Sequence, residues 1–166
     1  MAGPPVVPPH DAAVVFQRRT IESGSAVHLL ESSDIDDIVA GLSLTKPVGG
    51  QSVRVPAAEL LPRLGGAANP TDVLSALLAA GIGPREAQPF AAVLGGATAT
   101  VEIVALDDGQ RLLPGAVGVF CSPRGDVVTV PSTAADGAEW LTLAPATPRR
   151  VGLACAELVQ RRRAVR

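Results

Sequence analysis

The sequence predicts a single α+β domain in which an antiparallel sheet is flanked by helices. Three observations favour this class. Segments with alternating apolar side chains occur at residues 13–31 and again at residues 98–145. Between them, residues 57–95 hold apolar positions at helical spacing, punctuated by Pro and Gly. Finally, a chain of 166 residues with 47% apolar residues is large enough for one hydrophobic core.

The composition limits the partners and the compartment. The net charge is −2 and aromatic residues make up only 2% of the chain, so we expect a core of small aliphatic side chains. Acidic residues balance the arginines except at residues 161–163, so nucleic acid is not an expected partner. No apolar run approaches the roughly 18 residues of a membrane span, and no signal peptide is recognisable. These features predict a cytoplasmic protein without membrane insertion.

The N-terminal part predicts a disordered lead and a hairpin. Residues 1–11 hold four prolines, which support neither a helix interior nor a strand ladder. Residues 13–20 and 26–31 then alternate between apolar and polar side chains. The Glu-Ser-Gly-Ser segment at residues 22–25 provides a glycine-containing turn between them, so we expect two antiparallel strands.

A first helix is predicted over residues 34–42, because Ser33 can cap it and apolar residues follow at helical spacing. The carboxylates of Asp34, Asp36 and Asp37 suggest either a metal or acid–base cluster, or a capped helix start. Acidic residues in a first turn match the helix dipole, and this is their usual role. We therefore interpret them as structural.

The helical middle of the chain begins after a short strand at residues 51–56 that is closed by its last residue, a proline. Residues 57–64 predict a helix that Gly65 and Gly66 end.

Two further helices follow. The segment Asn69-Pro-Thr-Asp opens the first of them, which Gly81 ends. Pro84 opens the second, which extends to Gly95. Pro89 lies inside this helix and predicts a kink or a late start, because its nitrogen cannot donate to the helical ladder.

The C-terminal part predicts a strand, a block of three further strands, and a helix. Residues 98–106 alternate in side-chain polarity and predict a strand, and the Asp-Asp-Gly segment at 107–109 predicts the turn that follows it. Residues 115–132 form two strands around a Pro-Arg-Gly-Asp turn, and a third strand carries Trp140, the single tryptophan. The Thr147–Pro148 pair then starts the last helix.

Neither the cysteines nor the histidines predict a metal site. Cys121 and Cys155 have no CxxC or Cys/His spacing around them, and we interpret both as buried thiols. A surface disulfide or a catalytic thiol is the minor alternative. His10 and His28 lack partners at ligand spacing, so metal binding is not expected.

Motifs of enzymes are also missing from the sequence. The pair Cys121 and Arg124 does not form a phosphatase loop, and the tripeptide Arg-Gly-Asp at residues 124–126 is interpreted as a hairpin turn rather than an adhesion motif. No GxSxG, GxGxxG or GxxxxGK[ST] pattern occurs in a suitable context. We therefore expect no catalysis and no cofactor.

Several segments between residues 14 and 160 are informative through their order along the chain, although no single one of them is diagnostic. They are the hairpin 14–31, the helix 34–42, the Ser-Val-Arg-Val-Pro-Ala segment 52–57, the Gly-Ile-Gly-Pro-Arg-Glu-Ala-Gln-Pro-Phe segment 81–90 before Gly95-Gly96, the strand 100–105, the block 115–132 and the segment 140–148. In this order the chain resembles the C-terminal half of the EspG family. This family comprises cytoplasmic chaperones of the type VII (ESX) secretion systems of actinobacteria.

The resemblance implies a fold and a function. The family fold is α+β, with a central sheet flanked by helical bundles and two halves related by a pseudo-two-fold axis. Its members bind the exposed hydrophobic tip of the PPE helical hairpin in PE/PPE heterodimers, keep the pair soluble and direct it to secretion. On this basis we expect an EspG-like domain over residues 12–160, a helical subdomain at about 57–95 and a basic tail at 161–166.

The resemblance covers only one half of the family fold, which predicts an exposed strand edge. Exposed edges pair with other chains. We therefore expect either a homodimer that imitates the other half or a separately encoded N-terminal half. The alternative functions are an interaction module that homodimerises without binding PE/PPE proteins and, less favoured, a small enzyme.

The helical subdomain also provides the candidate partner-binding residues. Residues 57–94 hold more apolar positions than short amphipathic helices need, and most of them are expected in a local core. A groove between helices is nevertheless a common way to bind a helical tip, and the family uses this region and the central sheet. The residues predicted to contact the partner are Leu60, Leu64, Leu78, Ile82 and Arg85.

Overall fold

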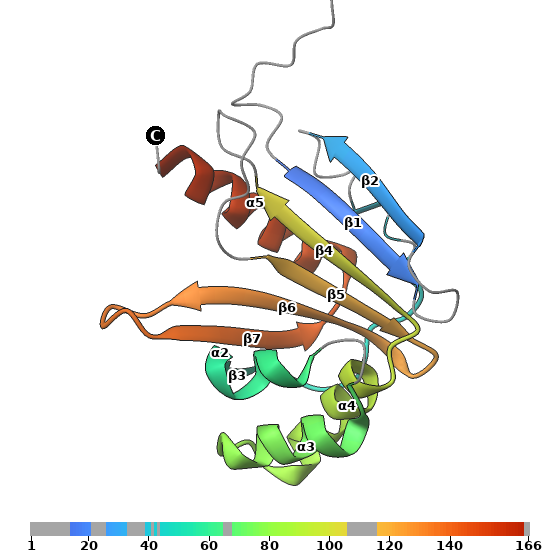
Figure 1. Cartoon of the computed structure of the whole chain (residues 1–166), viewed down its shortest axis with the longest axis vertical. Helices are drawn as coiled ribbons and strands as arrows, with labels where there is room; N and C mark the ends of the chain where they lie inside the picture. The colour runs from blue at the N-terminus through green and yellow to red at the C-terminus, as the bar shows by residue number, and fades with distance from the viewer. Residues whose placement is uncertain are drawn as a thin grey trace, which may run out of the picture.

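A seven-stranded antiparallel sheet forms the centre of the fold in the computed structural model, which describes residues 14–20, 26–32, 39–40, 42, 44–64, 68–105 and 116–164 (Figure 1). The strand order is β2-β1-β4-β5-β6-β7-β3. The strands are β1 (Val14–Thr20), β2 (Ala26–Ser32), β3 (Val53–Pro56), β4 (Ala99–Ala105), β5 (Val117–Ser122), β6 (Gly125–Thr133) and β7 (Glu139–Pro145). Each predicted strand is present, and the predicted α+β class with an antiparallel sheet and flanking helices is confirmed.

Helices cover both faces of this sheet. They are α2 (Ala57–Leu60), the 3-10 helix η1 (Leu61–Arg63), α3 (Pro70–Ala79), α4 (Pro84–Gly95) and α5 (Pro148–Ala164). Figure 1 shows α5 crossing the sheet near β4 and β5, whereas α2, α3 and α4 lie together beside β7 and β3. The helical subdomain predicted near residues 57–95 corresponds to this second group.

Side chains point alternately to the two faces of the sheet along each strand, and the buried ones form two clusters. In β7, Leu141 and Leu143 pack with the helical subdomain, whereas the adjacent Ala144 packs with α5. Successive side chains of a strand point to opposite faces of a sheet, so the two clusters lie on opposite faces. We call these the subdomain face and the α5 face.

The helix predicted over residues 57–64 is shorter than expected. Regular α-helix ends at Leu60, and a single 3-10 turn follows in which Leu64 N donates to Leu61 O at 3.1 Å. Pro62 accounts for the change, because it has no N–H to continue the α-helical ladder.

Helix α3 has the predicted signals at both ends. The Asn69 side chain accepts a hydrogen bond from Asp72 N at 2.9 Å and donates one to Asp72 Oδ2 at 2.8 Å. At the other end, Gly81 adopts a φ of 92°, and Ile82 N donates to Leu77 O at 3.0 Å. This pattern is a Schellman motif, which requires a left-handed residue and therefore favours Gly.

Pro89 lies within α4 without delaying its start. The helix begins at Pro84 and runs through Pro89 to Gly95, so the predicted late start does not occur. One ladder bond is missing at the proline. Burial of Ala87 and Phe90 on either side of it stabilises the continuous helix.

Helix α5 begins as predicted but extends further. Thr147 Oγ1 accepts a hydrogen bond from Arg150 N at 3.1 Å, which is an N-cap. The helix then continues to Ala164. The basic residues 161–163, which we expected in a separate tail, thus belong to the helical backbone.

Some predictions concern positions outside the described residues. They are the lead 1–11, the turns 22–25 and 107–109, the helix end at residues 65–66, and the helix 34–42 with its three aspartates, apart from Val39, Ala40 and Leu42. Leu42 itself is fully buried in the cluster on the α5 face.

Candidate protein-binding surface

The residues that the structure describes contain no group of three or more His, Cys, Asp and Glu side chains that could hold a metal ion. None of the described helices combines the length and the apolar character needed to cross a bilayer. The remaining candidates for a functional site are the two thiols, the Arg-Gly-Asp turn and the exposed apolar side chains.

Cys155 carries a free thiol. Cys155 is completely buried in the α5 face, and this burial raises its pKa from 9.0 to about 11. A reactive cysteine needs a lowered pKa, so this thiol is unsuited to nucleophilic chemistry at neutral pH. Cys121 is partly buried and packs against the same cluster. The interpretation of these residues as structural thiols agrees with both environments.

Two residues of the Arg-Gly-Asp turn, Gly125 and Asp126, are buried. Gly125 has a φ of 137°, and a Cβ atom added there would lie 2.9 Å from Val48 Cα. Asp126 is only 1% exposed, and its Oδ2 accepts hydrogen bonds from Thr45 N at 2.8 Å and Lys46 N at 3.0 Å. A buried aspartate is not accessible to a receptor, which confirms the structural interpretation.

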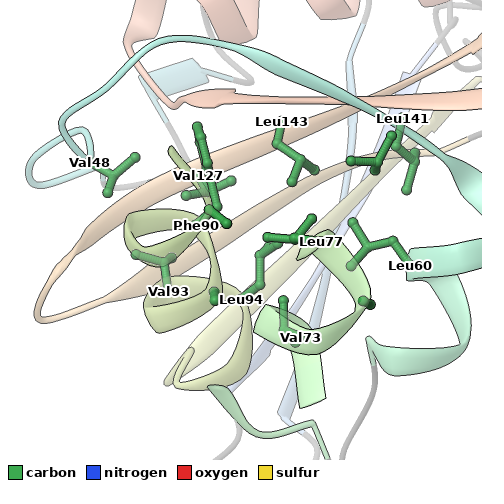
Figure 2. Packing of buried hydrophobic residues seen from close by; sticks show 14 of the residues in the cluster. Val48, Leu60, Val73, Leu77, Phe90, Val93, Leu94, Val127, Leu141 and Leu143 are labelled. Atoms are coloured by element: carbon green, nitrogen blue, oxygen red, sulfur yellow. The ribbon is translucent and has the colours of Figure 1, made fainter. Parts of the chain in front are cut away.

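The predicted partner-binding residues separate into buried and accessible ones. Figure 2 shows Leu60 and Leu77 facing each other inside the cluster between the helical subdomain and the sheet. Leu60 is 1% exposed, so its side chain offers no surface to a partner. This correction follows from its position at the end of α2, where it faces β7 and α3.

The other predicted residues retain accessible surface. Leu64 and Ile82 are half-buried against the same cluster, while Leu78 is 41% exposed and Arg85 is exposed. Sequence reasoning missed Leu61, which is 50% exposed at the start of η1. No local signal singles out Leu61, because Leu60 and Leu61 both lie at helical spacing from Leu64.

Exposed apolar side chains concentrate on the helical subdomain. Among the described residues, the exposed large hydrophobic side chains are those of Leu61, Leu78 and Leu153. Two of these three belong to η1 and α3, two elements in mutual contact. Exposed apolar surface on a folded domain is typical of a protein-binding site.

Comparison with known proteins identifies the family. A family model described as the EspG family matches residues 7–157. The chain belongs to the EspG family. This is a family of secretion chaperones, not of enzymes, and the resemblance noted in the sequence is confirmed.

A solved structure supports the EspG fold. The chain is similar to the Mycobacterium tuberculosis type VII secretion system chaperone EspG5, solved in complex with a PE25–PPE41 dimer, with a TM-score of 0.54 and 21% sequence identity. The alignment covers 79% of this chain and 52% of the EspG5 chain, so the present chain spans about half the length of that protein. No curated protein sequence gives a significant match.

Proposed function

We propose that this EspG-family chain is a type VII secretion chaperone that binds PE/PPE heterodimers, keeps them soluble and directs them to secretion. The family match over residues 7–157 carries the proposal. The similar fold of EspG5, which was solved with a PE–PPE dimer, adds support. Such a chaperone acts before its substrate leaves the cell, so the proposed compartment is the cytoplasm.

The proposed contact surface lies on the helical subdomain. It consists of Leu61, Leu64, Leu78, Ile82 and Arg85, with Leu61 taking the place of the buried Leu60. The expected occupant is the apolar helical tip of the PPE protein. Burial of this tip would contribute about 25 cal/mol per Å² of apolar area, before the costs of association are subtracted.

Mutation of Leu78 tests this proposal. The chain should co-purify with a PE/PPE pair encoded beside its gene when all three are expressed together. Leu78→Asp should reduce the recovered pair by at least about tenfold, because an aspartate would have to be desolvated in the apolar contact. Leu153→Asp is the matched control, since Leu153 is 58% exposed on α5, and α5 covers the other face of the sheet.

Two results would contradict the proposal. Failure of a folded wild-type chain to retain any PE/PPE pair would remove the chaperone function. An equal loss of the recovered pair with Leu153→Asp and Leu78→Asp would show that the contact surface is not on the helical subdomain.

A second candidate function is self-association through a sheet edge. β2 is the outermost strand, and within the described residues it pairs only with β1. The opposite edge strand, β3, is only four residues long and ends in Pro56, which makes it a poorer template. The outer edge of β2 is therefore the better template, and it favours pairing with a second copy of the chain or with a separately encoded N-terminal half.

Light scattering of the purified chain at micromolar concentration tests self-association. We expect the mass of a dimer, and a monodisperse monomer would overturn this candidate. A dimer that does not retain PE/PPE proteins would instead support an interaction module without chaperone function.

A further inference from the structure

A groove runs along the α5 face of the sheet, between α5 and the hairpin of β6 and β7. Its volume is about 620 Å³. Val130, Thr142 and Ala144 line it on the sheet side, and Arg149, Arg150 and Leu153 line it on the helix side. The proposed PE/PPE surface lies on the opposite face, so the groove is a separate feature.

The groove exists because α5 covers only part of its sheet face. The buried stripe of the helix, which includes Val151, Cys155 and Leu158, packs in the cluster that contains residues of β4, β5 and β6. Leu153 lies outside this stripe and remains 58% exposed. The sheet continues past the helix to β7 and β3. A floor that includes Val130, Ala144 and the hydroxyl residues Ser132 and Thr142 is left beside Leu153.

The rim of the groove is cationic. Arg149 and Arg150 are both exposed, and Arg150 Nη1 donates a hydrogen bond to Ser52 Oγ at 2.7 Å. Neither arginine forms an ion pair with a carboxylate in the part of the chain that the structure describes. Glu157, one helical turn beyond Leu153, is the acidic residue that also lines the groove.

Farther along the same face, β7 and β3 add another cation. The Arg54 guanidinium carbon lies 4.8 Å from the centroid of the Trp140 ring. Glu139 precedes Trp140 and is exposed. The chain as a whole is acidic, with 16 acidic and 14 basic residues, so the cationic rim contrasts with the overall charge.

The position of the two arginines is electrostatically unfavourable in the isolated domain. They occupy the first turn of α5, which contains no acidic residue. The N-terminus of a helix carries partial positive charge, which disfavours cations there and favours anions. A local conflict of this kind is more typical of a binding function than of folding. An anion opposite these arginines would remove the conflict.

We propose that this groove binds a short acidic and apolar segment of a partner protein. Its carboxylates would pair with Arg149 and Arg150, and an apolar side chain would lie between Leu153 and the floor at Val130 and Ala144. Arginine suits this role because its guanidinium forms paired hydrogen bonds with a carboxylate. The inference concerns a surface that the proposed PE/PPE contact does not use.

Peptide titration tests the inference. The probes are two fluorescein-labelled 16-residue peptides, one made of Leu and Glu and one made of Leu and Lys in the same order. Trp140 is the single tryptophan and no tyrosine is present, so intrinsic emission reports on this face alone. Its neighbour across the ladder, Ser132, lines the groove. We expect saturable binding of the Leu/Glu peptide with a change in Trp140 emission, weakened by added salt.

Variants of the full chain locate the binding. Arg149→Glu combined with Arg150→Glu should weaken binding of the Leu/Glu peptide by at least about tenfold. Leu153→Ser should weaken its binding as well. The control combines Arg63→Glu with Arg124→Glu, which changes the net charge equally at two exposed arginines outside the groove. Circular dichroism and thermal melting verify that every variant is folded.

Three results would overturn the inference. They are no saturable binding of the Leu/Glu peptide, equal binding of the Leu/Lys peptide, and an equal loss in the two double variants. Displacement of the peptide by a DNA oligonucleotide at equal charge concentration would also overturn it, because the groove would then bind polyanions in general. Since Leu78→Asp should leave peptide binding unchanged, failure here is distinguishable from failure of the PE/PPE proposal.

Discussion

Replacement of Asp126 by Ala should destabilise the domain by about 3 kcal/mol. The Asp126 carboxylate accepts hydrogen bonds from the backbone nitrogens of Thr45 and Lys46, and its removal leaves two partly buried donors without an acceptor. Each such donor costs about 1–3 kcal/mol. Part of this loss is offset, because the buried Oδ1 atom of Asp126 has no hydrogen-bond partner in the native structure.

The backbone of Asp126 adds to its structural role. Asp126 O accepts from Val48 N at 3.1 Å and from Ala146 N at 3.0 Å, and Asp126 N donates to Lys46 O at 2.8 Å. This residue therefore joins the segment before β3, the start of β6 and the end of β7. Loss of the side chain should loosen residues 44–48 first.

Urea denaturation of three variants measures the effect. Asp126→Asn keeps an acceptor for both nitrogens and should cost only about 1 kcal/mol. Asp136→Ala is the matched control, because Asp136 Oδ1 also accepts from a backbone nitrogen, that of Ala138 at 2.9 Å, but at an exposed turn. Its effect should stay within about 0.5 kcal/mol. If Asp126→Ala costs no more than Asp136→Ala, the carboxylate does not hold this segment.

The strands were predictable because their evidence is local. In β5 and β6 apolar residues lie on both sides of a short turn, and Gly125 provides the positive φ that the turn requires. The helix caps at Asn69 and Thr147 were predictable for the same reason, since a cap involves only the next three residues.

The candidate surfaces were less predictable because exposure depends on tertiary packing. Leu60 and Leu61 are adjacent and chemically identical, yet one is 1% and the other 50% exposed. Helical periodicity cannot separate them, because both lie at helical spacing from Leu64. The packing of α2 on β7 and α3 decides which of the two is buried. The bonds of Asp126 span about 80 positions in the sequence, and the groove beside Arg149 depends on where α5 crosses the sheet. No local pattern encodes either arrangement.

Gly95→Ala should destabilise the domain at least as much as Asp126→Ala. We expect the free energy of unfolding to fall by about 3 kcal/mol and the melting temperature by roughly 6–12 °C. The last turn of α4 passes directly against the start of α3. A Cβ atom at Gly95 would lie 2.5 Å from Pro70 Cα and would overlap Pro70 N and the Asn69 carbonyl carbon. These are backbone atoms, so no side-chain rotation can relieve the clash, and α3 must move away from α4.

Gly49→Ala is the control for Gly95→Ala, because a Cβ atom there meets nothing within 4 Å and the residue has no positive φ. It should change stability by less than about 0.5 kcal/mol. The displaced α3 carries Leu78, so a folded Gly95→Ala chain should also retain less PE/PPE protein than a folded Asp126→Ala chain of similar stability. Equal retention by the two variants would show that the position of α3 does not matter for partner binding, and would argue against the helical subdomain as the contact surface.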